Sequence, residues 1–207
     1  MRIFLMTLTA LLTVFVAVTS WAEDKDDKKG DTPAAVKVDN PHLVKVEDMA
    51  KALAESLNEE QSEALGLIRL SFGMVRSVSV VRDNVGDAVK KCGDDNEDMK
   101  DDLSARHKAW DDNIAPLIAK NEKLLSGALS KDRFGDHAGK VEAYLDELDK
   151  AAIHAEEKLD KQIVTTPEAC THLLESMDET EATLVALLDD ITWPEDGAPE
   201  TEESAAP

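Results

Sequence analysis

Three polar residues beside the apolar stripes of the predicted helices could do acid–base chemistry together. At a rise of about 1.5 Å per residue, Arg82 lies about 15 Å along its helix from Cys92, and His107 and Glu181 lie at nearly the same level. A histidine near a carboxylate can titrate close to neutral pH, which predicts a pH-responsive or ligand-contacting site. The alternative is an Arg82–Glu181 ion pair that fixes the register of two helices. We favour this structural interpretation, and we interpret Asn121 in the same way.

Common catalytic and metal-binding motifs are missing from the sequence. It has no glycine-rich phosphate loop, GxSxG, HExxH, CxxC or CxxCH motif. The ExxH spacing of di-iron bundles is also missing. The residues three before His107, His137, His154 and His172 are Ser104, Phe134, Ala151 and Ala169, none of them a glutamate. Haem ligation is disfavoured because His172 points about 140° away from Met177 around their helix. We therefore predict no cofactor, and a small-molecule, haem or metal-binding bundle using His107, Arg82 and Glu181 is the alternative.

A window without acidic residues, Ala64 to Arg82, is the strongest candidate for partner binding. Arg69 and Arg76 lie seven residues apart within it, and Phe72 lies between them on the same helical stripe. Arginine beside aromatic and aliphatic side chains is typical of protein-binding hot spots. The window therefore predicts that another protein binds at Arg69, Phe72 and Arg76.

An intramolecular contact would also account for this window. The short helix predicted at 46–57 carries Glu47, Asp48 and Glu55, and it could fold back onto the arginines. This alternative requires no external partner. An apolar patch is not always a binding site, because another part of the same chain can cover it. We regard it as the simpler of the two interpretations.

The charge of the chain excludes some functions. Its 207 residues carry 44 acidic side chains against 23 lysines and arginines, a formal net charge of -21. Such a surface repels phosphate backbones and anionic lipids, which argues against nucleic-acid binding and against membrane binding through a basic patch. No pair of a nucleophile and a base supports a hydrolase, so we expect a protein that is not an enzyme.

The start of the chain has the pattern of an export signal. Arg2 precedes an apolar run at 3–18, and Ser20-Trp21-Ala22 forms a small-x-small cleavage site. We expect a periplasmic or secreted protein with no membrane contact in its mature form, although an uncleaved segment could anchor it. The remaining chain divides into a flexible charged leader at 23–45, a helical domain at 46–193 and a disordered acidic tail at 194–207.

The helical domain has apolar residues every three or four positions, which predicts an all-α fold. Beyond the short helix at 46–57, we expect long helices at about 58–92, 99–128, 136–163 and 167–191. Asn58 and Gln61 form a capping-box signature, Gly93 is a stop signal, and Pro116 predicts a kink.

Short connections between four long helices favour an antiparallel up-down-up-down four-helix bundle. In this topology the first and fourth long helices are adjacent, and Cys92 and Cys170 lie at the same end. Because export leads to an oxidising compartment, the sequence predicts a Cys92–Cys170 disulfide. The predicted function is that of an interaction, scaffold or holdase-like module acting through protein contacts.

Overall fold

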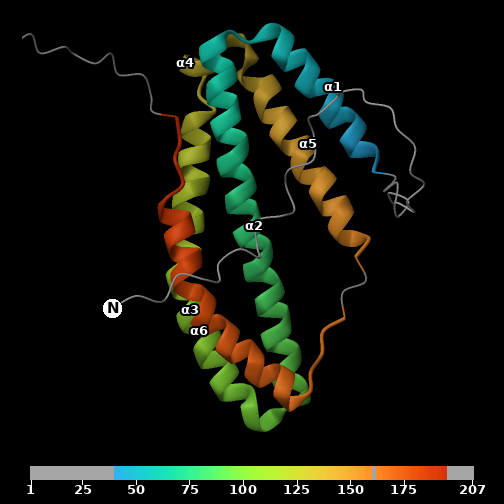
Figure 1. Cartoon of the computed structure of the whole chain (residues 1–207), viewed down its shortest axis with the longest axis vertical. Coiled ribbons are helices and arrows are strands. Elements are labelled where there is room, and N and C mark those ends of the chain that lie inside the picture. The colour runs from blue at the N-terminus through green and yellow to red at the C-terminus, as the bar shows by residue number, and fades with distance from the viewer. Residues whose placement is uncertain (1–39, 160–161, 195–207) are drawn as a thin grey trace, which may run out of the picture. The chain divides into compact units, whose positions relative to one another are not determined.

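The computed structural model describes residues 40–159 and 162–194, and within these residues it contains helices and no strands (Figure 1). All of them belong to one unit of the chain, Val38–Pro207, whereas the other unit, Met1–Lys37, lies outside the described residues. The predicted all-α class is confirmed. The signal sequence at 1–22, the leader up to residue 39 and the tail from residue 195 also lie outside the described residues, so these assignments stay predictions.

Polar side chains at the N-termini explain where the first two helices begin. The Asn40 side chain caps α1 (Pro41–Ser56) by accepting a hydrogen bond from the backbone N of His42 at 3.1 Å. Pro41 takes a first-turn position at which no backbone donor is needed. α2 (Glu59–Asp95) begins with the predicted capping box, in which Asn58 and Gln61 exchange hydrogen bonds of 2.8 and 3.2 Å.

The next helices follow the predicted order with shifted ends. Gly93 lies inside α2 rather than ending it. It is buried, and a Cβ at this position would lie 3.3 Å from the Lys100 side chain, so the glycine allows a close contact there. The turn η1 (Glu97–Met99) then leads into α3 (Lys100–Ala128), which contains Pro116. After α4 (Lys131–Phe134) and η2 (Gly135–His137) come α5 (Ala138–Glu157) and α6 (Pro167–Asp189).

The third predicted helix ends earlier than the sequence indicates. α5 ends at Glu157, whereas apolar periodicity predicted that it would extend to residue 163. Leu159 and Ile163 are exposed, so burial of an apolar face in a core does not support a helix at these positions. The chain then turns back, and the Thr166 side chain caps α6 by accepting a hydrogen bond from the backbone N of Ala169 at 3.3 Å.

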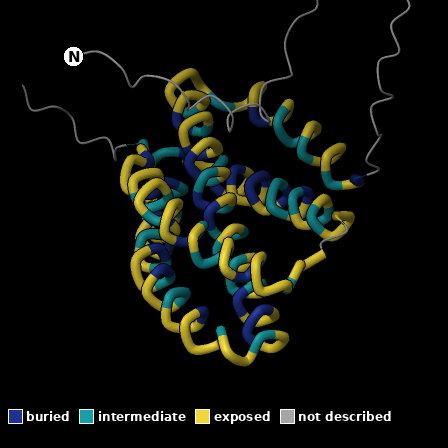
Figure 2. The backbone as a smooth tube through the Cα atoms, turned by 60° about the horizontal axis from the view of Figure 1, so that its bottom comes forward, coloured by how far each residue is buried: buried dark blue, intermediate teal, exposed yellow. Residues whose placement is uncertain are grey.

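α2 contacts helices of both halves of the domain. It packs along α3 and α6, whereas α5 packs mainly against α1. Figure 1 shows α1 and α5 side by side on one side of α2, with α3 and α6 on the other. Buried segments alternate with exposed ones along each helix, as an amphipathic helix requires (Figure 2).

This arrangement gives two hydrophobic cores instead of one. The first core, between α2, α3 and α6, contains Val75, Val78, Val89, Cys92, Leu103, Trp110, Ile114, Ile118, Cys170, Met177, Leu188 and Ile191. The second core lies between α1, α5 and the neighbouring parts of α2, α3 and α4, and it contains Leu53, Ala64, Ile68, Ala128, Phe134, Ala138, Val141, Tyr144 and Leu145.

The helix packing differs from the closed four-helix bundle that the sequence favoured. As predicted, α2 packs against α6, but α3 also packs against α6, and these two helices would be diagonal in a closed bundle. α5 instead pairs with α1, because α1 supplies its own apolar side chains, among them the buried Leu53, to a shared core. The up-down-up-down bundle is therefore not confirmed.

A short segment after α6 is held against α2 and α3 by polar contacts. The Ser71 hydroxyl donates a hydrogen bond to the backbone O of Thr192 at 2.8 Å, and Trp193 Nε1 donates to Asn121 Oδ1 at 2.8 Å. The buried Asn121 side chain also donates to the backbone O of Leu188 at 3.0 Å. Because Trp193 packs against both cores, this segment joins them.

Among the described helices, α2 is also the one that is long and apolar enough to cross a membrane. This is weak evidence, because length and composition alone do not distinguish a membrane span from other apolar helices.

Candidate interaction surface

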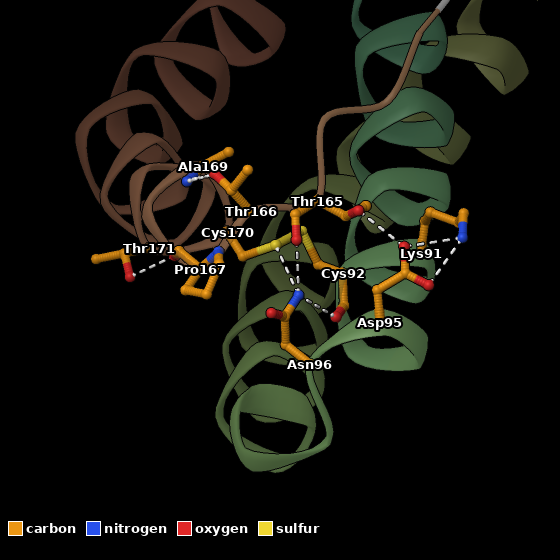
Figure 3. Close-up of a disulfide and its surroundings, with 10 residues drawn as sticks. All are labelled: Lys91, Cys92, Asp95, Asn96, Thr165, Thr166, Pro167, Ala169, Cys170 and Thr171. Carbon is orange, nitrogen blue, oxygen red and sulfur yellow. Dashed lines mark hydrogen bonds and ion pairs between the residues drawn. A yellow bond between two sulfur atoms is a disulfide. The ribbon is translucent and has the colours of Figure 1, made fainter.

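The two cysteines join the end of α2 to the start of α6. Cys92 and Cys170 form a disulfide with their Cα atoms 5.8 Å apart, which confirms the predicted pairing (Figure 3). Asn96 supports this corner, since its Nδ2 donates hydrogen bonds to the backbone O of Cys92 at 3.0 Å and of Thr165 at 2.9 Å. The Thr165 hydroxyl in turn donates to Asp95 Oδ2 at 2.8 Å. The residues around the disulfide therefore hold the end of α2 and the start of α6 together.

The predicted ion pair between Arg82 and Glu181 is wrong, because each residue has another partner. Arg82 Nε donates to Asp111 Oδ1 at 2.5 Å, which joins α2 to α3. Arg106 Nη2 donates to Glu181 Oε2 at 2.6 Å and also pairs with Asp178, which joins α3 to α6. Arg82 and Glu181 lie at similar levels along their helices, but they face different neighbours around α3.

His107 does not join a titrating site with Glu181. Its ring stacks on that of the buried Trp110, about one turn later in α3, with centroids 6.1 Å apart. A Cβ on Gly86 would lie 3.6 Å from His107 Nε2, so the imidazole packs where α2 has no side chain. His107 thus fills the contact between α2 and α3.

The carboxylates of these ion pairs make stability depend on pH. Hydrogen bonds from Arg82 lower the pKa of Asp111, and hydrogen bonds from Arg106 and then Asn113 lower the pKa of Glu181. A lowered folded-state pKa stabilises the fold above the usual carboxyl pKa of about 4, and this stabilisation is lost as pH falls through the lowered value.

We expect Asp111→Asn to reduce this pH dependence. The free energy of unfolding of the variant should fall less than that of the wild type between about pH 6 and about pH 2, because one carboxyl with a lowered pKa is missing. Urea denaturation at a series of pH values measures this difference. Asp101→Asn, at an exposed position on α3, is the control and should follow the wild-type curve. Parallel curves for wild type and Asp111→Asn would contradict the assignment.

Two of the three predicted partner-binding residues are used inside the molecule. Arg76 Nε and Nη1 donate hydrogen bonds of 2.6 Å to Asp149 Oδ1 and Glu156 Oε1 of α5. Phe72 is half-buried against the second core. Acidic side chains of the same chain do pair with Arg76, as the intramolecular alternative predicted, but they come from α5 and not from α1.

Arg69 lies on a part of α2 that the other described helices leave uncovered. We call Gly66, Arg69, Leu70, Gly73, Ser77 and Val81 the α2 outer face, since their spacing places them on one side of the helix. All of them are exposed, and the Leu70 side chain is 61% exposed. Arg69 forms no ion pair within the described residues, and a Cβ at Gly66 or Gly73 would have no neighbour within 4 Å.

The surface hollows of the described residues do not suggest a cofactor site. One of these hollows, about 420 Å³, is open and lined by Asn113, Asp178, Glu181, Ala182 and Val185. Its carboxylates already hold Arg106. Met177 is buried in the first core and His172 is exposed 3.6 Å from Glu175, so these two possible haem ligands do not face a common space. No group of three potential metal ligands occurs in the described parts of the chain.

One polar cluster was not predicted from the sequence. His42 Nδ1 lies 2.7 Å from Glu147 Oε1, and the ring of His154 lies edge-on to that of His42 with centroids 6.0 Å apart. Hydrogen bonding by His42 lowers the pKa of Glu147, with Lys45 adding to the effect. The Asn40-Pro41 start of α1 is the signal that could have revealed it, since it places His42 in the first turn. This cluster fastens α1 to α5.

No protein-family model matches the chain, and neither a curated protein sequence nor a solved structure is significantly similar to it.

Proposed function

We propose that this chain is an exported, non-enzymatic helical protein that acts through protein–protein contacts made by the α2 outer face. The observation that carries the proposal is an exposed apolar surface on a strongly acidic chain. Its arginine, Arg69, forms no ion pair within the described residues. Residues 64–82 contain no acidic side chain, although the whole chain carries 44. Protein interfaces are enriched in arginine and depleted in aspartate and glutamate, and their buried centre is more apolar than the remaining surface.

Export is supported by the sequence of residues 1–22 and by the cysteine pair. The first 22 residues have the charge, apolar run and cleavage pattern of a signal peptide. Disulfides persist in oxidising compartments such as the periplasm or the extracellular space, and Cys92 and Cys170 are paired in this chain. The proposal also includes a disordered acidic tail and long helices running up-down-up-down.

The proposed role is that of an interaction, scaffold or holdase-like module. Arg69 and Leu70 would make direct contact with a partner. Phe72 and Arg76 would contribute indirectly, because they hold α2 in place against the second core and α5. In this proposal Arg69 contacts the partner directly, whereas the sequence predicted that Arg69, Phe72 and Arg76 would all do so.

Charge reversal at Arg69 tests the proposal. We expect Arg69→Glu to reduce binding of the mature protein to its partners by about tenfold or more, because the variant places a carboxylate in a stretch of α2, residues 64–82, that carries no acidic side chain. Affinity capture from the exported fraction of the producing cells, with quantitative mass spectrometry, measures the bound proteins. Lys123→Glu makes the same charge change at an exposed position on α3 and should have no effect. An unchanged set of captured proteins for Arg69→Glu would overturn the proposal.

A further inference from the structure

The α2 outer face is arranged so that two copies can match. Gly73 and Val81 lie four residues before and after Ser77, which is itself exposed. If two such helices cross in opposite directions at Ser77, Val81 of each copy lies at the level of Gly73 of the other. Because a Cβ at Gly73 would meet no atom within 4 Å, this position leaves room for the valine.

We infer that the partner of the α2 outer face is a second copy of this chain, docked antiparallel with the two α2 helices crossing near Ser77. The inference rests on the proposed function in one respect, namely that this face binds protein. It adds the identity of the partner and the register of the contact.

Charge favours a second copy at this face. Two chains of net charge -21 repel wherever their carboxylates meet, but within residues 64–82 neither copy contributes an acidic side chain. Repulsion from the rest of each surface is screened beyond about 8 Å at physiological salt. The acid-free face is thus the part of α2 on which self-association costs least electrostatically.

Charged residues at the edge of the face also complement one another. Asp87 follows Arg69 by 18 residues, which is about five turns at 3.6 residues per turn, so both lie on the same flank of α2. A twofold axis perpendicular to two antiparallel helices brings the same flank of each together. Arg69 of one copy then lies beside Asp87 and the 76% exposed side chain of Asp83 in the other copy. The symmetry generates this contact twice.

A cysteine at the crossing point tests the geometry directly. With the two helices crossing at Ser77, mild oxidation of mature Ser77→Cys should give a covalent dimer with twice the chain mass on a non-reducing gel. Peptide mapping should show a bond between the two residues at position 77 and an intact Cys92–Cys170 bond. Ser126→Cys, exposed on α3, is the control and should remain a monomer. Equal cross-linking of both variants, or none at position 77, would overturn the inference.

Sedimentation equilibrium of the mature protein supplies an independent measurement. We expect a monomer–dimer equilibrium that Leu70→Glu weakens by about tenfold or more. Leu159→Glu, at a leucine 62% exposed just after the end of α5, should leave it unchanged. Arg69→Asp and Asp87→Arg should each weaken the dimer, and the double variant should restore it. Circular dichroism establishes that each variant is folded.

The outcomes separate this inference from the proposed function. A wild-type protein that stays monomeric at all accessible concentrations overturns the second copy as partner. If Arg69→Glu still abolishes capture of other proteins in that case, the α2 outer face remains a binding surface for a different partner.

Discussion

Replacing both Cys92 and Cys170 by alanine should lower the free energy of unfolding by about 4–5 kcal/mol. The bond closes a loop whose ends are 78 residues apart, and in the chain-entropy model such a cross-link acts by restricting the unfolded chain. Both sulfurs are also buried in the first core, so the alanines leave unfilled space. Urea denaturation under non-reducing conditions measures the loss.

Reduction of the wild type is the control for the disulfide prediction. Wild-type protein unfolded in the presence of a reductant should lose a similar amount of stability, because the loop is then open without any change of sequence. The reductant should have no effect on the double variant. A loss of less than about 1 kcal/mol in both experiments would mean that the corner between α2 and α6 does not constrain the fold.

Trp110→Ala should destabilise the protein by about 3–5 kcal/mol, the usual cost of removing a large buried aromatic side chain. Trp110 is fully buried at the centre of the first core, where α2, α3 and α6 meet, and its ring also supports the stacked ring of His107. Because α2 belongs to both cores, we expect the α1–α5 half to unfold in the same transition.

Far-UV circular dichroism and near-UV circular dichroism during urea denaturation test both parts of this prediction. Trp110→Phe keeps most of the buried ring and should lose clearly less stability than Trp110→Ala. Two separated transitions in the alanine variant would show that the two cores fold independently, and a loss below about 1 kcal/mol would contradict the central position of Trp110.

Local signals in the sequence predicted the helices and the disulfide well. The capping box at Asn58 and Gln61 and the capped start of α6 at Thr166 depend on residues within one turn, so they can be recognised without a structure. Cys92 and Cys170 could be paired because only the order of the helices and the ends of two of them were needed.

Pairing between helices was harder to predict because it depends on rotation around each helix axis as well as on level. Arg82 and Glu181 lie at similar levels, but Asp111 and Arg106 face them more directly. The chain has 44 acidic side chains, so each arginine has several candidate partners and the sequence cannot choose among them. The pairing of α5 with α1, in place of a closed four-helix bundle, was also not predicted. An apolar stripe shows that a helix packs against something, but it does not specify which other helix it contacts.

The bare face of α2 could be predicted in part. The lack of acidic residues at 64–82 was visible in the sequence, but which arginines remained free was not. Asp149 and Glu156 of α5 hold Arg76 because α5 lies beside the first half of α2, a position set by the second core. Arg69, seven residues earlier on the helix, lies beyond their reach and stays exposed.

Site-specific photo-cross-linking at Leu70 is the measurement that tests the α2 outer face most directly. A photoreactive amino acid at position 70 of the mature protein should give a covalent protein adduct on illumination, and the same amino acid at the equally exposed Leu159 should not. An adduct at position 70 with twice the chain mass is the predicted result. Absence of any adduct at position 70, or equal adducts at both positions, would contradict the assignment of this face as the interaction surface.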